Sequence, residues 1–399
     1  MSTSGTARRI VLIREHKGAQ YGNVLDEATA AYASGFAAHG YLPQIVECGD
    51  VEPFLDEVPR LVADPAVAAF FSVGGKGLLC TRADGSQATP FDSCAKPVIV
   101  QHGDHPYQSW IRQVVRVEFP GKLTFFNDPT SIDYVRRLPQ DAARTFYSPP
   151  CIFGTDLPYG AGGRDIPVIF VGIIDNPRST RGRLVAEYPE LGAAFDALLE
   201  HAVNEMAIPL VQKAAEVIAT LGSDLDLLSE RGQIFLHRCD WAIRHLRRRR
   251  CLFRVRRHPV LVVAQKPGTW PGMHPDSRFV ARLPFQEVLA LCDRARVVLL
   301  PQPTYPYGLT ERILFCMDRG VAVVANWSPV VDRHFEREKD LLTTRNDFSD
   351  VEARLDQALD ERVRAPMAER ARAAVRRQFM PEQVTGGYLA RARTAGLIP

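Results

Sequence analysis

The chain has little net charge for its size. Its 49 Lys and Arg residues nearly balance 46 Asp and Glu residues, which leaves a net charge of +3 on 399 residues. A protein that binds nucleic acid through its surface charge usually carries a concentrated basic excess. We therefore expect no nucleic-acid partner.

The cysteines lack the spacing of a metal site or a disulfide framework. Zinc sites and redox motifs place cysteines in close pairs, and disulfide-rich domains are much shorter than this chain. No Cys-x-x-Cys pair occurs among Cys48, Cys80, Cys94, Cys151, Cys239, Cys251, Cys292 and Cys316. Free thiols in a reducing compartment are the simpler interpretation, so we expect a cytoplasmic protein without a zinc knuckle or a disulfide framework.

Long apolar runs and common nucleotide motifs are also missing. The first apolar run, Ile10 to Ile13, is too short for a signal peptide or a membrane span, so we expect no targeting segment. The run Gly74-Gly75-Lys76-Gly77 is not a P-loop, and no Gly-x-Gly-x-x-Gly follows the first predicted strand. An ordinary ATPase or NAD-dependent enzyme is therefore disfavoured.

The first part of the chain alternates strand and helix patterns. Its 46% hydrophobic content and its length are enough for about two domains. The predicted strands are 9–13, 43–46, 66–73, 97–101, 123–126 and, more weakly, 145–147, with helices over 23–39 and 51–63. This alternation predicts a parallel sheet covered by helices.

A second alternating region follows a stretch of turn-forming residues at 158–163, which predicts a linker. Strands are predicted at 166–171, 260–264, 279–281 and 297–300, with helices within 191–221 and over 240–250, 285–293, 351–359, 367–379 and 381–393. The sequence thus predicts an α/β protein of two doubly wound parallel-sheet lobes. We assign residues 1–160 and 161–372 to the lobes and 373–399 to a C-terminal helical segment.

Residues 297–326 are the most informative part of the chain. A buried strand leads into a loop rich in proline that contains Gly308, a helix opens near Thr310, and a second apolar run follows Gly320. In a parallel sheet this order places a helix amino terminus beside the carboxyl end of a strand. Free N–H groups there can receive a phosphate, so we expect a nucleotide-linked ligand.

The same segment carries a family resemblance. It reads Gly308-Leu309-Thr310-Glu311-Arg312-Ile313-Leu314-x-x-Met317-x-x-Gly320, followed by Val323-Val324. This pattern resembles the donor-site segment of group 1 glycosyltransferases of the GT-B fold, and most closely their spore-protein-like branch. Many group 1 enzymes have a glutamate that holds the ribose where this chain has Phe315. Glu311 or another group would then take that role, or the nucleotide is held differently.

The resemblance implies two Rossmann-like lobes facing a cleft, with a nucleotide-sugar donor on the second lobe and no bound metal or cofactor. The last helix of such enzymes typically crosses back to the first lobe. The donor-binding residues it implies are Tyr307, Gly308, Leu309, Thr310 and Arg312, with Glu311 as a catalytic candidate near the sugar or the ribose. Helix capping alone also explains Thr310 and Glu311.

Three further residues are donor-binding candidates. Gly172 ends the predicted strand 166–171, where a ligand can approach the backbone closely, although it also suits a simple turn. Arg178 and Arg181 follow it, and guanidinium groups suit bidentate contact with a diphosphate. Their alternative is an ordinary solvated loop.

The first lobe offers candidates for the acceptor side. Asp104 and His105 follow the predicted strand 97–101, and either could take a proton from an acceptor hydroxyl group or hold the donor sugar. A structural alternative has Asp104 capping a turn and His105 fixed before Pro106. The spacing superficially resembles metal ligands, but the resemblance favours contact with substrate. The turn Asn127-Asp128-Pro129 is a weaker candidate of the same kind.

Arginines are concentrated between Arg244 and Arg257. A basic helix face can attract anionic lipid head groups or phosphate-bearing acceptors, which would allow peripheral contact with the inner face of a membrane. A solvated helix face is the alternative.

The sequence therefore predicts a glycosyltransferase that moves a sugar from a nucleotide-sugar to a hydroxyl group of a glycan, a lipid-linked or a small-molecule acceptor. Two alternatives remain at this point. One is a nucleotide-sugar epimerase of the same architecture, and the other is a non-catalytic nucleotide-sugar-binding protein, because fold does not settle function.

Overall fold

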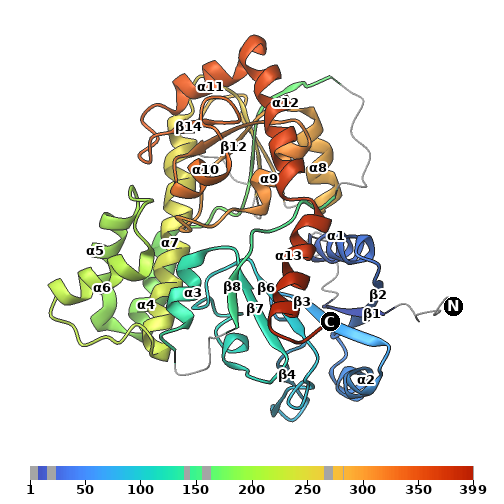
Figure 1. The fold of residues 1–399 in the computed structure, drawn as a ribbon. Coiled ribbons are helices and arrows are strands. Elements are labelled where there is room, and N and C mark those ends of the chain that lie inside the picture. Colours follow the sequence, from blue (N-terminus) through green and yellow to red (C-terminus); the bar gives the residue numbers. More distant parts are fainter. Residues whose placement is uncertain are drawn as a thin grey trace. The chain divides into compact units, whose positions relative to one another are not determined.

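The computed structural model describes residues 8–15, 24–138, 144–154, 163–264, 273–281 and 283–398. The chain divides into two compact units, one formed by Met1–Thr155 with Gln378–Pro399 and the other by Asp156–Arg377. Within the described residues each unit contains a six-stranded parallel sheet, and Figure 1 labels some of the strands of each. The two doubly wound lobes expected from the sequence are thus confirmed. Residues 158–162 of the predicted linker, with the boundary after residue 160, lie outside the described residues.

The sheet of the first unit has the strand order β2-β1-β3-β6-β7-β8. Its inner strands are buried on both faces and accordingly read as continuous apolar runs, as in β1, where Ile10 to Ile13 are at most 2% exposed. The strands are β1 (Arg9–Arg14), β2 (Leu42–Glu47), β3 (Val67–Val73), β6 (Val98–His102), β7 (Lys122–Phe126) and β8 (Thr145–Tyr147), with a small separate pair, β4 (Cys80–Thr81) and β5 (Gln87–Ala88).

The last helix of the chain packs within the first unit. The helices of this unit are α1 (Val24–Ala38), α2 (Val51–Ala63), α3 (Pro129–Val135) and α13 (Pro381–Thr394), with a short 3₁₀ turn at Val114–Arg116. A Cβ atom on Gly35 of α1 would lie 2.5 Å from the carbonyl oxygen of Pro381, so glycine allows α13 its close approach. The buried Tyr388 donates a hydrogen bond of 2.8 Å to Oε1 of Gln101 at the end of the sheet.

The sheet of the second unit has the order β11-β10-β9-β12-β13-β14. In chain order this is 3-2-1-4-5-6, the doubly wound arrangement whose strand order reverses between the first and the fourth strand. The reversal therefore falls between β9 and β12. The strands are β9 (Ile166–Val171), β10 (Val260–Val263), β11 (Arg278–Val280), β12 (Ala295–Leu300), β13 (Ala322–Asn326) and β14 (Leu342–Thr344).

A group of helices is inserted between β9 and β10. It consists of α4 (Pro177–Glu187), a 3₁₀ turn at Pro189–Leu191, α5 (Gly192–Ala202), α6 (Leu210–Thr220) and the long α7 (Glu230–Arg254). Figure 1 shows α4, α5 and α6 gathered beside α7. The other helices of this unit are α8 (Phe285–Arg294), α9 (Glu311–Asp318), α10 (Pro329–His334), α11 (Val351–Leu359) and α12 (Glu361–Gln378), and α12 runs without a break across residues 372 and 373.

Helix α7 corrects the sequence-based interpretation of its arginines. It is longer than predicted, since Ser229 caps it by accepting a hydrogen bond of 3.1 Å from the N–H of Gly232. Arg244, Arg247 and Arg248 are 8%, 2% and 7% exposed. The prediction of a solvated or lipid-facing basic face is wrong for these three residues, because their side chains are buried and bond to the β12–α9 loop, to the end of α5 and to the residues after β9. Among the described helices, none combines the length and apolar character needed to cross a membrane.

Candidate functional site

The candidate site lies at the carboxyl edge of the second sheet, where the strand order reverses. Residues 172–176 connect β9 to α4, and residues 301–310 connect β12 to α9. Because β9 and β12 are parallel neighbours, both connections leave the sheet at the same edge. Ligands of doubly wound sheets bind in the crevice at this position.

The turn before α9 presents open backbone amides. Thr310 is in an extended conformation with φ −92° and ψ 142°, and its side chain makes no capping hydrogen bond. No residue that the structure describes accepts the N–H of Glu311 or of Arg312. Gly308, Leu309 and Thr310 are buried beneath them. The first turn of α9 thus keeps two unfilled donors at the positive end of the helix, which suits an anion.

Arg312 places its guanidinium group over the end of β9. Its Nη1 donates a hydrogen bond of 3.1 Å to the carbonyl oxygen of Val171. A Cβ atom on Gly172 would lie 3.0 Å from the same Nη1. Glycine at position 172 is therefore the residue that leaves room for the Arg312 guanidinium, so two predicted donor-binding residues, Gly172 and Arg312, are brought together.

A second guanidinium group reaches the same strand end from α7. Nη1 of Arg248 donates a hydrogen bond of 2.6 Å to the carbonyl oxygen of Ile173, the residue after Gly172. Sequence reasoning missed Arg248 as a site residue. The available signal was the spacing of Arg244 and Arg248, which puts them on one helix face with the apolar Cys251 and Leu252.

The positive charge of these two arginines is not balanced locally. Burial lowers the pKa of Arg248 well below its usual value, and the neighbouring charge of Arg312 lowers it further. In the described part of the chain neither Arg248 nor Arg312 forms an ion pair with a carboxylate. The buried Asp240 opposes this lowering of the Arg248 pKa, but its carboxylate is engaged by Arg244, whose Nη2 lies 2.7 Å from Oδ2 of Asp240. The strand end therefore has the electrostatics of an anion site.

The loop after β12 is held in place by α7. Thr304 donates its hydroxyl hydrogen to Oδ1 of Asp240. Arg244 lies over the ring of Tyr305, 4.7 Å from its centroid, and donates a hydrogen bond of 2.6 Å to its hydroxyl oxygen. Arg247 donates one of 3.2 Å to the carbonyl oxygen of Pro303. Three consecutive loop residues are thus fixed before the chain reaches the turn at 307–312.

The loop after β9 is held by the same helix. Nδ1 of His245 accepts a hydrogen bond of 3.1 Å from the N–H of Asp175. Burial, together with the charge of Arg248, lowers the pKa of His245 to about 3, so the ring is neutral at physiological pH and carries its proton on Nε2.

Glu311 and Phe315 differ in what they face. Glu311 is half-buried at the start of α9, and no described residue bonds to its carboxylate. Phe315 is 3% exposed and packs edge-on against Phe285 of α8, with ring centroids 5.3 Å apart. The position of the family glutamate thus belongs to the apolar core in this chain, whereas Glu311 is half-buried at the start of α9. Tyr307 is half-buried beside it.

The remaining donor-binding candidates lie on a helix that the sequence did not predict. Asn176 caps α4 by accepting a hydrogen bond from the N–H of Arg178, whose side chain is exposed. Arg181 forms a bidentate pair with Asp196 of α5, with Nε–Oδ1 and Nη2–Oδ2 distances of 2.7 Å. Within the described residues no hydrogen bond or ion pair joins either arginine to the turn at 307–312. Their role in donor binding stays a prediction, and Arg181 has a structural role in the α4–α5 contact.

The candidates of the first unit lie at the carboxyl end of β6. His105 is 4% exposed, its Nδ1 lies 3.0 Å from the hydroxyl oxygen of Ser131, and its ring stacks on that of Tyr107. These contacts support the structural interpretation of His105. Asp104 is half-buried next to it. Burial lowers the pKa of His102 to about 3, with a small opposing effect from the Asp104 carboxylate.

No group of three or more His, Cys, Asp or Glu side chains in the described ranges has the arrangement of a metal site. The weaker candidate at 127–129 is a helix start, because Asp128 caps α3 through the N–H of Thr130 at 2.8 Å.

Comparison with known proteins agrees with this geometry. Residues 240–390 match the glycosyl transferase-like family model. Among solved structures, sucrose-phosphate synthase from Thermosynechococcus elongatus is 13% identical, with a TM-score of 0.51 over 98% of this chain and 100% of that chain. HepE from Anabaena, solved in complex with UDP and glucose, is also 13% identical, with a TM-score of 0.48 over 97% and 100%. No curated protein matches the chain.

The family match spans both arginines of the site, Arg248 and Arg312, and the whole turn at 307–312. The likeness to sucrose-phosphate synthase supports the two-sheet fold. The branch of the family stays a prediction. The resemblance to group 1 glycosyltransferases of the GT-B fold is confirmed, and residues 240–390 are the part of this chain that carries the glycosyl transferase-like family pattern.

Proposed function

We propose that the protein is a glycosyltransferase that takes a sugar from a nucleotide-sugar and binds the donor diphosphate at the carboxyl edge of β9. One observation carries this proposal. Arg248 and Arg312 approach the same strand end without a carboxylate partner in the described residues, beside two open amides of α9. A diphosphate supplies the negative charge and the acceptor oxygens that this arrangement lacks.

The proposed chemistry follows from where charge develops during transfer. When the bond between the sugar and the diphosphate breaks, negative charge grows on the leaving phosphate oxygen. Arg312 and the amides of Glu311 and Arg312 are already oriented by the contacts described above, so they can stabilise that charge without reorganising. Donors of this kind are worth about 10²–10³-fold in rate.

Glu311 is proposed to hold the sugar or the ribose. Its carboxylate starts α9 and has no partner among the described residues, and a carboxylate can accept hydrogen bonds from two neighbouring hydroxyl groups. Glu311 would thus hold the ribose in place of the family glutamate, whose position is occupied here by Phe315, a ring packed against α8. Glu311→Gln should raise the KM for the donor more than it lowers kcat if the contact is to the ribose.

The first unit is proposed to bind the acceptor, with Asp104 taking the proton of the attacking hydroxyl group. Asp104 follows β6 at the carboxyl edge of its sheet and is half-buried. His105 is the less favoured base because its Nδ1 is engaged with Ser131. A carboxylate is a competent general base when it lies within hydrogen-bond reach of the hydroxyl group.

The first experiment is calorimetric titration of the full chain with UDP, GDP, ADP and CDP, and with their glucose conjugates. We expect one nucleoside diphosphate to bind in preference to the others. Arg312→Met and Arg248→Met should each weaken that binding by about 10- to 100-fold, as expected for a charge-assisted hydrogen bond. The matched control is Arg257→Met, an arginine of the same unit that pairs with Asp356; it should leave binding unchanged.

Absence of saturable binding for the whole panel would overturn the proposal. Equal losses in Arg257→Met and Arg312→Met would also contradict it, because the effect would then be structural. Incubation of the preferred nucleotide-sugar without acceptor, with analysis of the sugar, separates the proposed transferase from an epimerase, which would invert a sugar carbon under these conditions.

A further inference from the structure

A cavity lies between α5 and α6, within the inserted helices. It is distant along the chain from the turn at 307–312, which we call the donor turn because of its proposed function. Its volume is about 400 Å³, within the range of pockets that bind small molecules. It is lined by Ala197, His201, Glu205, Ile208, Lys213, Glu216, Val217, Thr220 and Leu221. Neither the family match nor the proposed chemistry accounts for this cavity.

The cavity contains a buried ammonium group with few partners. Lys213 of α6 is 5% exposed, and its Nζ donates a hydrogen bond of 2.8 Å to the carbonyl oxygen of Glu205. Within the described residues this is the single hydrogen bond of Nζ, although an ammonium group has three N–H donors, and no carboxylate lies within ion-pair distance. A buried charge is normally paired, so the unfilled donors indicate a missing anionic partner.

The other lining residues indicate what the rest of the ligand must be like. The carboxylate of Glu205 is engaged, since it accepts a hydrogen bond of 2.6 Å from the N–H of Ala207. Glu216 is exposed at the rim and accepts one of 3.3 Å from the side chain of Gln212. Val217 and Leu221 supply an apolar wall, and Leu221 is 48% exposed, one of the few large apolar side chains so open. The ligand therefore needs an acidic end and an apolar body.

We propose that this cavity binds a small carboxylic acid with an apolar body, whose carboxylate group is held by Lys213, and that its binding is coupled to the donor turn through the carbonyl group of Glu205. The proposed binding of a carboxylic acid is independent of the proposed function. The coupling rests on the proposed function, because it requires that the donor turn binds a nucleotide.

The coupling follows from a shared acceptor. The carbonyl oxygen of Glu205 accepts hydrogen bonds from Nζ of Lys213 at 2.8 Å and from Nη2 of Arg247 at 2.9 Å. Arg247 also binds the carbonyl oxygen of Pro303 in the loop that leads to the turn. A second, smaller cavity is lined by Lys213, Arg247 and Thr304 together. A bound carboxylate that attracts the ammonium group of Lys213 weakens the hydrogen bond from Nζ to the carbonyl oxygen of Glu205. The hydrogen bond from Arg247 to the same oxygen then changes, and with it the contact between Arg247 and the loop at Pro303.

The binding test uses octanoate and its neutral analogue octanamide as probes, titrated calorimetrically into the full chain. We expect octanoate to bind at least about 10-fold more tightly than octanamide, the size of one buried charge-assisted contact. Lys213→Met keeps the apolar stem and should remove the difference between the two probes. Equal affinities in the wild type, or a preference that survives in Lys213→Met, would overturn the site.

The pH dependence gives a second readout. Burial lowers the pKa of Lys213 to about 8, and the charge of Arg247 acts in the same direction, while Glu205 and Glu216 oppose it. Octanoate binding should therefore weaken as the pH rises through about 8, where the ammonium group loses its proton. His201→Gln removes the histidine of the same lining and keeps Lys213, so it should leave this dependence in place.

The coupling test measures the affinity of the preferred nucleoside diphosphate with and without saturating octanoate. We expect a change of several-fold in the wild type, with the reciprocal change in octanoate affinity that linkage requires, and no change in Lys213→Met. An unchanged affinity in the wild type would overturn the coupling and leave the site standing. If no nucleoside diphosphate binds, the proposed function fails, and the comparison of octanoate with octanamide still decides the cavity.

Discussion

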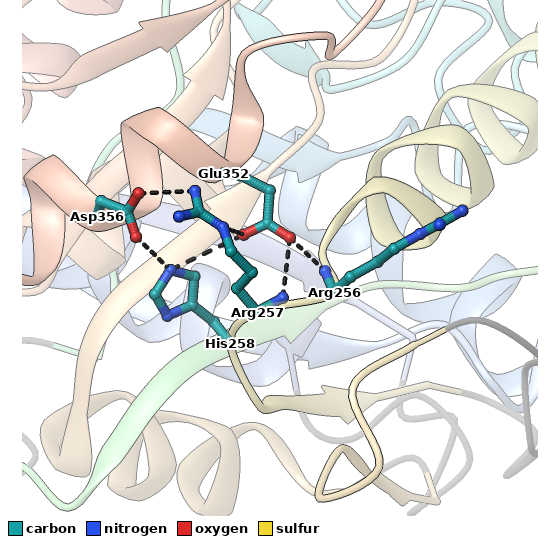
Figure 2. Close-up of polar contacts among 5 residues, drawn as sticks. All are labelled: Arg256, Arg257, His258, Glu352 and Asp356. Carbon is teal, nitrogen blue, oxygen red and sulfur yellow. Dashed lines mark hydrogen bonds and ion pairs between the residues drawn. The ribbon is translucent and has the colours of Figure 1, made fainter.

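Charged side chains are paired at one edge of the second sheet, whereas two arginines lack carboxylate partners among the described residues at the other. Just before β10 begins, Arg257 and His258 meet Glu352 and Asp356 of α11 in a compact cluster (Figure 2), with Arg257 Nη2 2.7 Å and His258 Nε2 2.8 Å from the carboxylate oxygens of Asp356. Glu352 also accepts the backbone N–H of Arg257 at 2.9 Å. Every side chain in this cluster has an oppositely charged or polar neighbour.

At the carboxyl edge of β9, Arg248 and Arg312 form no ion pair with a carboxylate among the described residues. Arg248 is enclosed, and its pKa is lowered by burial and by the charge of Arg312. The fold therefore accepts repulsion between two guanidinium groups at this edge, whereas opposite charges are paired at the other. Unbalanced charge in a buried setting costs stability and is kept where a ligand completes it. The comparison therefore separates an edge where charged side chains pair with one another from the edge where we propose that an anion binds.

Loss of Asp240 should have the largest effect. Asp240 is fully buried and is the acid that pairs with Arg244 at the carboxyl edge. Asp240→Asn would leave Arg244 as a third unbalanced cation, and breaking a buried pair in this way typically costs about 3–5 kcal/mol. Chemical denaturation should show a lower free energy of unfolding by about that amount. A decrease in the free energy of unfolding of less than about 1 kcal/mol would contradict the inference that Arg244 needs Asp240 as its buried partner.

Arg312→Met should cost about 10²–10³-fold in kcat/KM, because it removes a positioned donor from the leaving diphosphate. The free energy of unfolding should not fall, since the change relieves the repulsion of Arg248. Steady-state kinetics and denaturation on the same preparation check both parts. A variant that lost stability and activity together would place Arg312 with the structural arginines of the opposite edge.

Gly172→Ala should lower donor affinity by about 10-fold. The new Cβ atom would lie 3.0 Å from Nη1 of Arg312, a contact that the guanidinium group relieves by moving a few tenths of an ångström. Small displacements of a positioned group have large effects on binding geometry. Titration with the preferred nucleoside diphosphate measures the loss. The matched control is Gly182→Ala on α4, where a Cβ atom meets nothing within 4 Å, and binding there should be unchanged.

Asp356→Asn should have the smallest effect, on stability alone. Burial would raise the pKa of Asp356, but hydrogen bonds from His258 and Arg257 outweigh it and hold that pKa below its usual value. The stabilisation is therefore present above pH ~4, the usual range of the unfolded carboxyl group, and is lost as the pH falls through the lower folded pKa. Solvent screening keeps it below about 1 kcal/mol. Melting temperatures of wild type and variant should differ at pH 7 and converge at low pH.

Regular elements with clear apolar patterns were predictable from the sequence. Helix α2 and strand β9 begin and end where the pattern places them, at 51–63 and 166–171, and so does β8 at 145–147, whose pattern is weaker. Helix α4 was missed because its first turn, Pro177-Arg178-Ser179-Thr180-Arg181, has no apolar periodicity. That helix is set instead by the Asn176 cap and by proline at its first position.

The site was predictable where it depends on local geometry and not where it depends on tertiary partners. The turn at 307–312 could be found because strand, glycine and helix start are adjacent in the chain. The spacing of Arg244 and Arg248 indicates a shared helix face but not what that face contacts. The roles of Arg248 and Phe315 depend on tertiary partners, which are the strand end for Arg248 and Phe285 of α8 for Phe315. The sequence of α7 predicts an arginine-rich helix, and that pattern is the same whether the arginines face solvent or are buried.

The anchoring of the β12–α9 loop on α7 has a consequence for the order of folding. The bonds from Arg247 to Pro303 and from Thr304 to Asp240 join residues 56 and 64 positions apart. Long-range contacts of this kind form late, after the loop between them has closed. The register of β9 with β12 spans still more of the chain, because it pairs Ile166 with Ala295, so by the same reasoning this pairing forms later still. During refolding, nucleotide-binding competence should therefore appear together with the completed sheet, after α7 has docked on the loop.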